Sequence, residues 1–403
     1  MPQDTFVATP TLVIGLGGSG LKVATFVKKS LLEVNRNQSP ERVAILVLDT
    51  EKEIKFKAGG WGRERSQYHA TGPVTIAGGE YVPLTGDVKS LGVALRNEQL
   101  EAAADPRVRR AQAHRHISSW FQAQYYIEEA GVDDAVWNLD VGAGQYRQLG
   151  RLGLFSHVDK LRDVLSNVLA AVRRMGANAL YVHVVGSLVG GTGAAMFADV
   201  AHMVKELAPL ANFTQSPVVF GHFILTEGFR GTPAVQLADA GVRAQFDARC
   251  YAALRELTRL QGTTIARTDG YPLVYNPEGT GALNSRLRKA PYTAVYLYDG
   301  IRPNNELNTR QIEEGLAPAI ADAIVAYVDE RSGGAFCSHS VNYQAFYPAY
   351  GLPAGQVTYG SVGTYTIELP IYHITEGWVH GLAQEALDKL LAPRDKDPST
   401  QIP

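Results

Sequence analysis

The sequence predicts an α/β protein with a doubly wound, mostly parallel sheet. Unbroken apolar runs alternate with segments of helical periodicity along most of the 403 residues. This alternation is typical of parallel strands that are covered by helices on both faces. Several of the apolar runs end in glycine-rich loops. In sheets of this kind a ligand sits outside the carboxyl ends of the strands, so we expect the functional site at those loops.

The first fifty residues form a predicted β-α-β unit. Apolar residues fill 12–15 and 43–48, which predicts two buried strands, and residues 21–34 carry apolar side chains at helical spacing. Residues 55–105 are rich in glycine and polar residues, and we expect them to form an insertion over one edge of the sheet. Residues 106–130 begin with a proline and are expected to be helical.

The rest of the chain continues the alternation of strands and helices. Apolar runs predict strands at 180–187, 217–225, 293–300 and 363–370. Apolar periodicity predicts helices at 157–175, 194–207, 234–260, 310–328 and 376–391. The turn-rich stretch 262–290 is a candidate hairpin, and the end of the chain is a polar tail.

The composition argues against several classes of protein. Lysine and arginine (38) nearly balance aspartate and glutamate (40), and the net charge of −2 does not indicate attraction to nucleic acid or to a membrane surface. The two cysteines, Cys250 and Cys337, are far apart and lack metal-ligand spacing. We expect no signal peptide, because residues 1–10 have neither a basic start nor an apolar core, and no apolar run approaches membrane-spanning length. We therefore expect a cytoplasmic protein without a membrane segment, a nucleic-acid partner or a side-chain metal site.

The first glycine loop, GLGGSG (15–20), follows a predicted strand and precedes a predicted helix. Glycines let the backbone turn tightly and approach a ligand, and the helix N-terminus presents free N–H groups to a phosphate. Taken alone, the loop also fits a Rossmann domain, because Asp49 or Glu51 at the end of the next strand could bind ribose hydroxyls. An NAD-dependent oxidoreductase is therefore one interpretation, and a purely structural glycine turn is another.

Two further glycine loops favour a triphosphate ligand. The second glycine loop, GSLVGGTGAAMF (186–197), is again a strand, a glycine turn and a helix, and its Thr192 can hydrogen-bond a phosphate. The third glycine loop, GAGQYRQLGR (142–151), permits a nest of N–H groups that holds an anion, and Arg147 and Arg151 could supply charge to a terminal phosphate. A dehydrogenase needs one such turn, so several at different strand ends indicate a triphosphate held from several sides.

In this order the loops resemble the phosphate loops of the tubulin/FtsZ superfamily. VGGTGAA is similar to the signature GGGTGSG, with Val189 in place of its first glycine and with Ala194 and Ala195 in place of serine and glycine. GLGGSG is similar to the first phosphate loop, GAGQYRQLGR to the FtsZ loop that opens with GAG and closes with Gly-Arg, and DTE (49–51) to the loop after the second strand. The resemblance covers roughly residues 10–375, and the prokaryotic tubulin-like proteins are the relatives that it favours.

The resemblance implies that the chain binds GTP or GDP with Mg²⁺. The first loop would meet the α- and β-phosphates, the second would cradle the β- and γ-phosphates, and the third would sense the γ-phosphate. By position, the implied nucleotide-binding residues are Gly15, Gly17, Gly18, Ser19, Gly20, Asp49, Thr50, Glu51, Gly142, Ala143, Gly144, Gly190, Gly191, Thr192, Gly193 and, beside the ribose, Glu227 and Arg230.

The resemblance also implies how the base is recognised. RPNNELN resembles segments whose asparagine reads guanine, and the two possible alignments select Asn304 or Asn305. We favour Asn305; an amide suits guanine because it offers a donor and an acceptor on one planar group. Asp322, on the central helix, is a further candidate for the guanine edge.

The resemblance further implies the fold and the domain organisation. A tubulin/FtsZ-type GTP-binding domain would span residues 1–308, with the insertion at about 55–105, and a central helix would span 309–330. Residues 331–403 would form the start of a partial or reduced second domain and the polar tail. Superfamily members assemble head to tail through an interface that holds the nucleotide, so we expect the chain to be its own partner in a homo-oligomer or filament.

GTP hydrolysis is expected to be weak. In the superfamily a neighbouring subunit inserts a loop with acidic residues, and the nearest match here, SVNYQAFYPAY, offers Asn342 and Gln344, the latter where an acid is expected. A glutamine can orient a water molecule but cannot serve as a carboxylate base. The resemblance thus implies a cytoskeletal-type GTPase of low activity. The alternatives are a non-polymerising nucleotide-dependent switch or scaffold, and the NAD-dependent oxidoreductase that the second and third loops disfavour.

Overall fold

The computed structural model describes residues 6–35, 38–58, 73–105, 107–108, 112–129, 134–140, 142–232, 240–266, 271–275, 283–287, 290–300, 312, 315–334, 359–362 and 371–391. The chain divides into two compact units, Met1–Thr364 and Tyr365–Pro403. In the second unit the structure describes a single helix, α12 (Ile371–Leu391).

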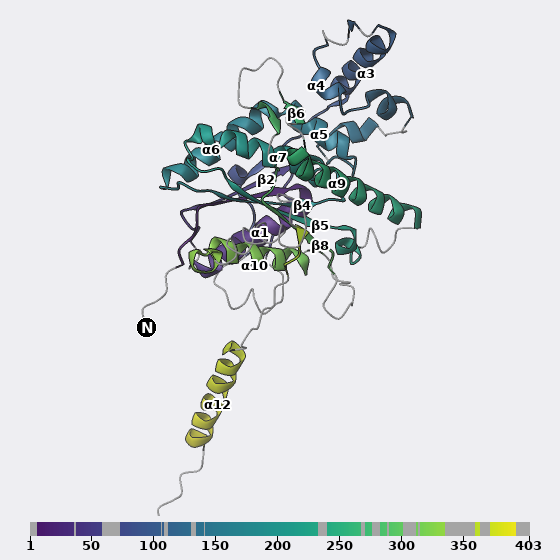
Figure 1. Ribbon diagram of the computed structural model, residues 1–403. Helices are drawn as coiled ribbons and strands as arrows, with labels where there is room; N and C mark the ends of the chain where they lie inside the picture. Colours follow the sequence, from purple (N-terminus) through teal and green to yellow (C-terminus); the bar gives the residue numbers. More distant parts are fainter. Residues whose placement is uncertain are drawn as a thin grey trace, which may run out of the picture. The chain divides into compact units, whose positions relative to one another are not determined.

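A seven-stranded sheet, parallel throughout, forms the centre of the first unit (Figure 1). The strands lie in the order β3-β2-β1-β4-β5-β8-β9. Their bounds are β1 Thr11–Leu16, β2 Val43–Asp49, β3 Tyr81–Pro83, β4 Tyr181–Ser187, β5 Val218–Ile224, β8 Ala294–Tyr298 and β9 Tyr359–Gly360. The strand order reverses between β1 and β4. The crevice outside the carboxyl ends of these two strands is therefore the place where such sheets bind ligands.

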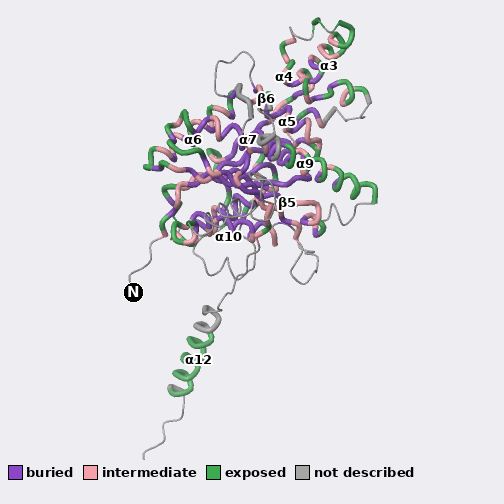
Figure 2. The backbone as a smooth tube through the Cα atoms, in the orientation of Figure 1, coloured by how far each residue is buried: buried purple, intermediate pink, exposed green. Residues whose placement is uncertain are grey.

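Helices cover both faces of the sheet because alternate residues of each strand point to opposite sides. Leu12 and Ile14 of β1 share one core with residues of α6 and α7, whereas Val13 packs into a second core with α1 and α10. The central strands are buried along nearly their whole length (Figure 2). This two-sided burial explains why these strands are apolar without interruption.

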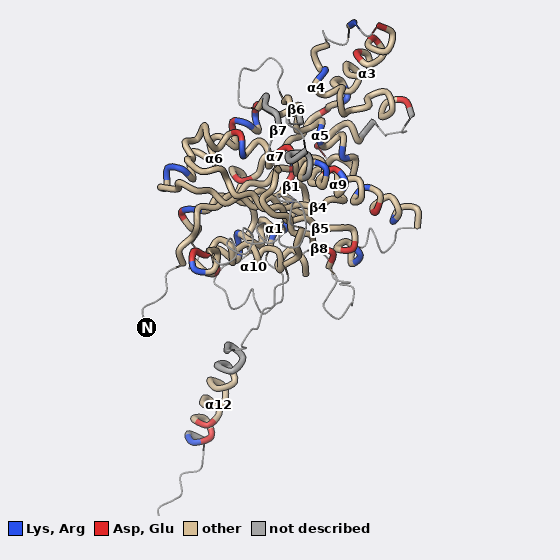
Figure 3. Tube along the Cα trace, viewed as in Figure 1, with Lys and Arg blue, Asp and Glu red and all other residues tan. Residues whose placement is uncertain are grey.

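Among the described residues of the first unit, the helices carry most of the charged side chains, which are mixed in sign, while the central strands are almost free of charge (Figure 3). The α-helices are α1 Gly17–Val34, α3 Lys89–Ala104, α4 Arg115–Ser118, α5 Arg147–Ser156, α6 Val158–Arg174, α7 Gly193–Leu207, α9 Ala240–Ala266 and α10 Leu316–Val328. Shorter helical turns are η1 Gly78–Glu80, η3 Tyr125–Glu129, η4 Asp134–Trp137, η5 Pro209–Ala211 and η6 Thr226–Phe229. An antiparallel hairpin, which the sequence predicts within 262–290, is formed by β6 Tyr271–Val274 and β7 Asn284–Leu287.

The predicted fold class is confirmed, and the predicted strands at 12–15, 43–48, 180–187, 217–225 and 293–300 appear as β1, β2, β4, β5 and β8. The predicted helices at 21–34, 157–175 and 194–207 appear as α1, α6 and α7, and those at 234–260, 310–328 and 376–391 overlap α9, α10 and α12. The predicted strand at 363–370 lies outside the described residues. Among the helices of the described ranges, none has the length and apolar character of a membrane span.

One prediction between residues 55 and 130 is wrong, and another is incomplete. The segment expected to form an insertion over one edge of the sheet contains α3 and contributes the edge strand β3 to the sheet. Gly92 lowers the helix propensity of α3, but a side chain there would collide with Trp137, since an added Cβ would lie 2.4 Å from its ring. The predicted helix at 106–130 is instead the short α4 and the π-helical turn η3 among its described residues, with Phe121 between them fully buried and stacked on Tyr126.

Candidate nucleotide-binding site

The first glycine loop joins β1 directly to α1 at the switch point. Gly17, the first residue of α1, has φ +66°, and an added Cβ would lie 3.1 Å from the Cβ of Thr192. Gly20 lies against β4, since an added Cβ there would be 2.6 Å from the Val185 carbonyl oxygen. The loop therefore needs glycine for two reasons, a left-handed turn and close packing of α1 on the sheet.

The second glycine loop contacts both of the other loops. It links β4 to α7, which begins at Gly193. An added Cβ at Gly191 would lie 2.9 Å from the Cβ of Ala143 and 3.0 Å from the amide nitrogen of Gln145, both in the third loop. The predicted convergence of the three loops is therefore present in the structure, with the second loop in the middle.

Hydroxyl and carboxylate groups join the end of β2 to the second loop. The hydroxyl oxygens of Thr50 and Thr192 are 2.7 Å apart, and the Thr192 hydroxyl donates to Oδ1 of Asp49 at 3.2 Å. The same Asp49 oxygen accepts the amide N–H of Glu51 at 3.3 Å. Asp49, Thr50 and Thr192 are buried, and this burial raises the pKa of the Asp49 carboxyl to about 6. These oxygen groups lie beside the first and second loops, where a phosphate-bound cation would meet them.

Three helix N-termini face this region without side-chain caps. Within the described residues, α1, α5 and α7 have neither a capping side chain nor an acidic residue in the first turn. N–H groups of their first turns and the positive ends of their dipoles can therefore bind an anion, although the Ala195 amide of α7 already donates to the Thr192 carbonyl oxygen at 3.1 Å. The third loop adds left-handed backbone at Gly142, Gly144 and Gln145, with φ of +94°, +53° and +68°.

The loops also leave space for a ligand. An added Cβ at Gly18, Gly142 or Gly190 would meet no described atom within 4 Å. One glycine of this kind belongs to each loop. The backbone at these positions is thus open to close approach by a phosphate, in contrast to Gly20 and Gly191, whose added Cβ atoms would collide with protein atoms.

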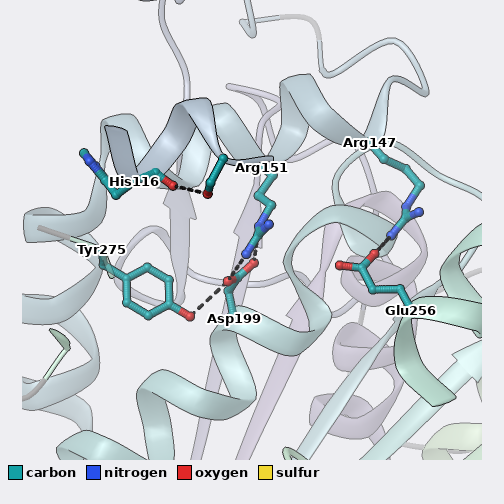
Figure 4. A network of polar contacts seen from close by, with 7 residues as sticks. His116, Arg147, Arg151, Asp199, Glu256 and Tyr275 are labelled. Atoms are coloured by element: carbon teal, nitrogen blue, oxygen red, sulfur yellow. Dashed lines mark hydrogen bonds and ion pairs between the residues drawn. The ribbon is translucent and has the colours of Figure 1, made fainter. Parts of the chain in front are cut away.

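The two arginines of the third loop bind protein groups (Figure 4). Arg151 donates through Nε and Nη2 to the two carboxylate oxygens of Asp199 on α7, both at 2.8 Å, and Tyr275 donates to the same carboxylate at 2.9 Å. Arg147 pairs with Glu256 of α9 and donates to the Ala194 carbonyl oxygen at 3.0 Å. In these positions the arginines fasten α5 to α7 and α9, and the suggested role on a terminal phosphate has no support. Sequence patterns could not reveal Asp199 and Tyr275, which lie far from Arg151 in the chain.

The remaining predicted residues are less closely tied to the loops. Glu227 and Arg230 form an ion pair with each other on and just after η6, which follows β5. Asp322 of α10 accepts a hydrogen bond from Ser30 at 3.4 Å. Ser30 is thirteen residues beyond Gly17 in α1, about 20 Å along the helix axis, so this placement does not support contact of Asp322 with a nucleotide. Asn304, Asn305, Asn342 and Gln344 lie outside the described residues.

Comparison with known proteins found similar solved structures and a matching family model. Similar solved structures include CetZ2 from Haloferax volcanii, a GTPγS-bound protofilament, with 14% sequence identity, a TM-score of 0.36, and coverage of 79% of this chain and 59% of that chain. CetZ1 from the same organism, a GDP-bound monomer, has 13% identity, a TM-score of 0.36, and coverage of 80% and 62%. CetZ from Methanosaeta thermophila strain DSM 6194 has 12% identity, a TM-score of 0.35, and coverage of 80% and 56%.

The chain therefore spans about three fifths of the length of these solved structures. No curated protein matches it. The family model described as "Tubulin like" matches residues 12–388, which include all three glycine loops and every strand of the main sheet after the first residue of β1. The chain belongs to the tubulin-like family.

Proposed function

We propose that the chain binds GTP or GDP at the carboxyl ends of β1, β2 and β4. The observation that carries this proposal is that the first and third glycine loops both contact the second, with an open backbone position in each of the three loops. Membership of the tubulin-like family supports guanine as the base. The Asn304 and Asn305 side chains remain the predicted readers of that base.

The number of anion sites favours a triphosphate over a dinucleotide. A Rossmann dehydrogenase binds its pyrophosphate with one glycine turn and one helix N-terminus. Here α1, α5 and α7 each present an uncapped N-terminus beside a glycine loop. The three phosphates of a triphosphate would occupy all three helix N-termini, whereas the two phosphates of a dinucleotide would leave one N-terminus without an anion.

Asp49 and Glu51 are the residues that fit Mg²⁺ best. Asp49 is the last residue of β2 and Glu51 follows two residues later, and Asp49 lies beside Thr192 of the second loop. Carboxylate and hydroxyl oxygens suit this cation, which also keeps water and phosphate ligands. When bound, Mg²⁺ would neutralise phosphate charge, and a neighbouring cation would also favour the ionised form of Asp49, whose pKa burial raises to about 6.

Nucleotide titrations test the proposal. Calorimetry of the purified chain with GTP, GDP, ATP and NAD, each with Mg²⁺, is expected to give at least tenfold tighter binding of GTP than of ATP or NAD. Equal or tighter binding of ATP would refute the guanine assignment. Binding of NAD alone would restore the oxidoreductase interpretation.

We further propose head-to-tail self-assembly of a cytoplasmic protein with slow GTP hydrolysis, as the family resemblance implies. Sedimentation and phosphate release, measured over a range of protein concentrations with GTP or GDP, test this part. GTP-dependent pelleting with slow phosphate release is the expected result. A chain that binds GTP but stays monomeric would favour the nucleotide-dependent switch, and fast release would refute the assignment of Asn342 and Gln344.

A further inference from the structure

Helix α9 contacts the third glycine loop through an arginine. The Arg249 guanidinium donates from Nη1 to the side-chain carbonyl of Gln145, and from Nη2 to Gln245 at 3.3 Å. It also lies 5.6 Å from the centre of the Phe246 ring. Phe246 is buried in the main core, so Arg249 is held against a fixed part of α9 and in turn holds Gln145.

A second contact ties the same part of the chain to α9. Arg147, two residues after Gln145, pairs with Glu256 (Figure 4). It also donates to the Ala194 carbonyl oxygen in the first turn of α7. Two side chains of α9, seven residues apart, thus hold the loop and the beginning of α5. We call this set, Gln145, Arg147, Arg249 and Glu256, the α9 clamp.

The backbone of Gln145 is the point at which the clamp acts on the site. Gln145 has φ +68°, which lies in the left-handed region that residues other than glycine rarely adopt. Its amide nitrogen lies at the contact with Gly191 of the second loop. An exposed glutamine in this conformation needs a compensating interaction, and the hydrogen bond from Arg249 provides one.

We propose that the α9 clamp is a positioning device that sets the preference of the site for a nucleoside triphosphate over a diphosphate. This inference rests on the proposed nucleotide site. The first and second loops, at the N-termini of α1 and α7, flank the switch point and suffice for two phosphates. The third loop contacts the second at Gly191 and supplies a third set of backbone N–H donors. Its geometry therefore matters only when a terminal phosphate is present. Arg249 acts through Gln145 and need not touch the ligand.

Matched variants test the clamp. Arg249→Met keeps an unbranched side chain over Phe246 but removes the hydrogen bond to Gln145. We expect it to weaken binding of a non-hydrolysable GTP analogue by roughly tenfold, the effect of one hydrogen bond, and to leave GDP affinity within about twofold. Arg255→Met is the control, because Arg255 lies on the same helix but donates to the exposed Tyr251; it is expected to change neither affinity.

Substitutions of Gln145 separate positioning from direct contact. Gln145→Ala loses the side-chain hydrogen bond and keeps the unfavourable φ, so it should weaken the GTP analogue selectively. Gln145→Gly loses the same hydrogen bond but adopts this φ freely, so it should bind the analogue more tightly than Gln145→Ala does.

Calorimetry with the analogue and with GDP is the measurement, and thermal unfolding identifies variants that fail to fold. Equal losses for both nucleotides, or no loss in Arg249→Met, would overturn the clamp while leaving the nucleotide site intact. Equal affinities of the two Gln145 variants for the analogue would overturn the role of the backbone conformation. A wild-type chain that binds neither nucleotide would overturn the proposed function itself.

Discussion

Replacing Gly190 by alanine should separate nucleotide affinity from folding. In the structure an added Cβ at Gly190 meets no described atom within 4 Å, and its φ lies outside the left-handed region. The methyl group therefore costs the folded protein no collision and no backbone strain. In the proposed complex, however, the same methyl group would occupy the space beside the second loop that the phosphate needs.

The two expected effects have opposite signs. Gly→Ala at a compatible position stabilises a protein by about 0.4–1 kcal/mol, because it reduces the freedom of the unfolded chain. Displacing a phosphate from one N–H donor costs about 1.5–3 kcal/mol, the value of a hydrogen bond to a charged group. At about 1.4 kcal/mol per factor of ten, this corresponds to a loss of affinity of roughly 10- to 150-fold.

Calorimetric titration with GTP, together with thermal unfolding of the ligand-free protein, measures both effects. The control is Gly79→Ala in η1, where an added Cβ also meets nothing within 4 Å but no glycine loop is near in sequence. Gly191→Ala provides the contrast, since its Cβ would collide with the third loop and should lower the melting temperature. Unchanged GTP affinity in Gly190→Ala would refute the placement of the phosphate at the second loop.

Two further predictions concern stability. Breaking the buried ion pair with Asp199→Asn leaves the Arg151 charge without its partner, so unfolding in urea should show a loss of about 3–5 kcal/mol; a loss below 1 kcal/mol would contradict this. Acid should also destabilise the chain, because burial lowers the pKa of His116 and, by a larger amount, the pKa of three further histidines. They are His183, with a pKa of about 3, His202, with a pKa of about 4, and His222, with a pKa well below the usual value. Near pH 5 the unfolded chain binds about three protons at these sites that the folded chain does not, while the raised pKa of Asp49 makes the folded chain bind about one proton more. Stability should therefore fall by about 3 kcal/mol per pH unit as the pH drops below about 6. Urea midpoints that stay constant from pH 6.5 to pH 5 would show that the histidines are not buried in neutral form.

The fold was largely predictable because its signal is local. A parallel strand covered on both faces must be apolar throughout, so β1, β4 and β5 appear as unbroken runs. The same reasoning did not predict the elements between residues 55 and 130. There Gly92 lies inside a helix because Trp137 packs against it, and a contact between residues so far apart leaves no periodic pattern in the sequence.

The candidate site divides in the same way. The sequence by itself determined which loops carry glycines, where these loops stand relative to strands and helices, and that their order matches the tubulin-like family. These features were accessible because backbone conformation and the positions of helix N-termini depend on neighbouring residues. Only the tertiary structure decided which loops touch and which charges are already paired. It joins Thr192 to Asp49 and Thr50, directs Arg151 to Asp199 and brings Arg249 to Gln145. An arginine pairs with whichever acceptor the fold places nearby, and its neighbours in the sequence do not identify that acceptor.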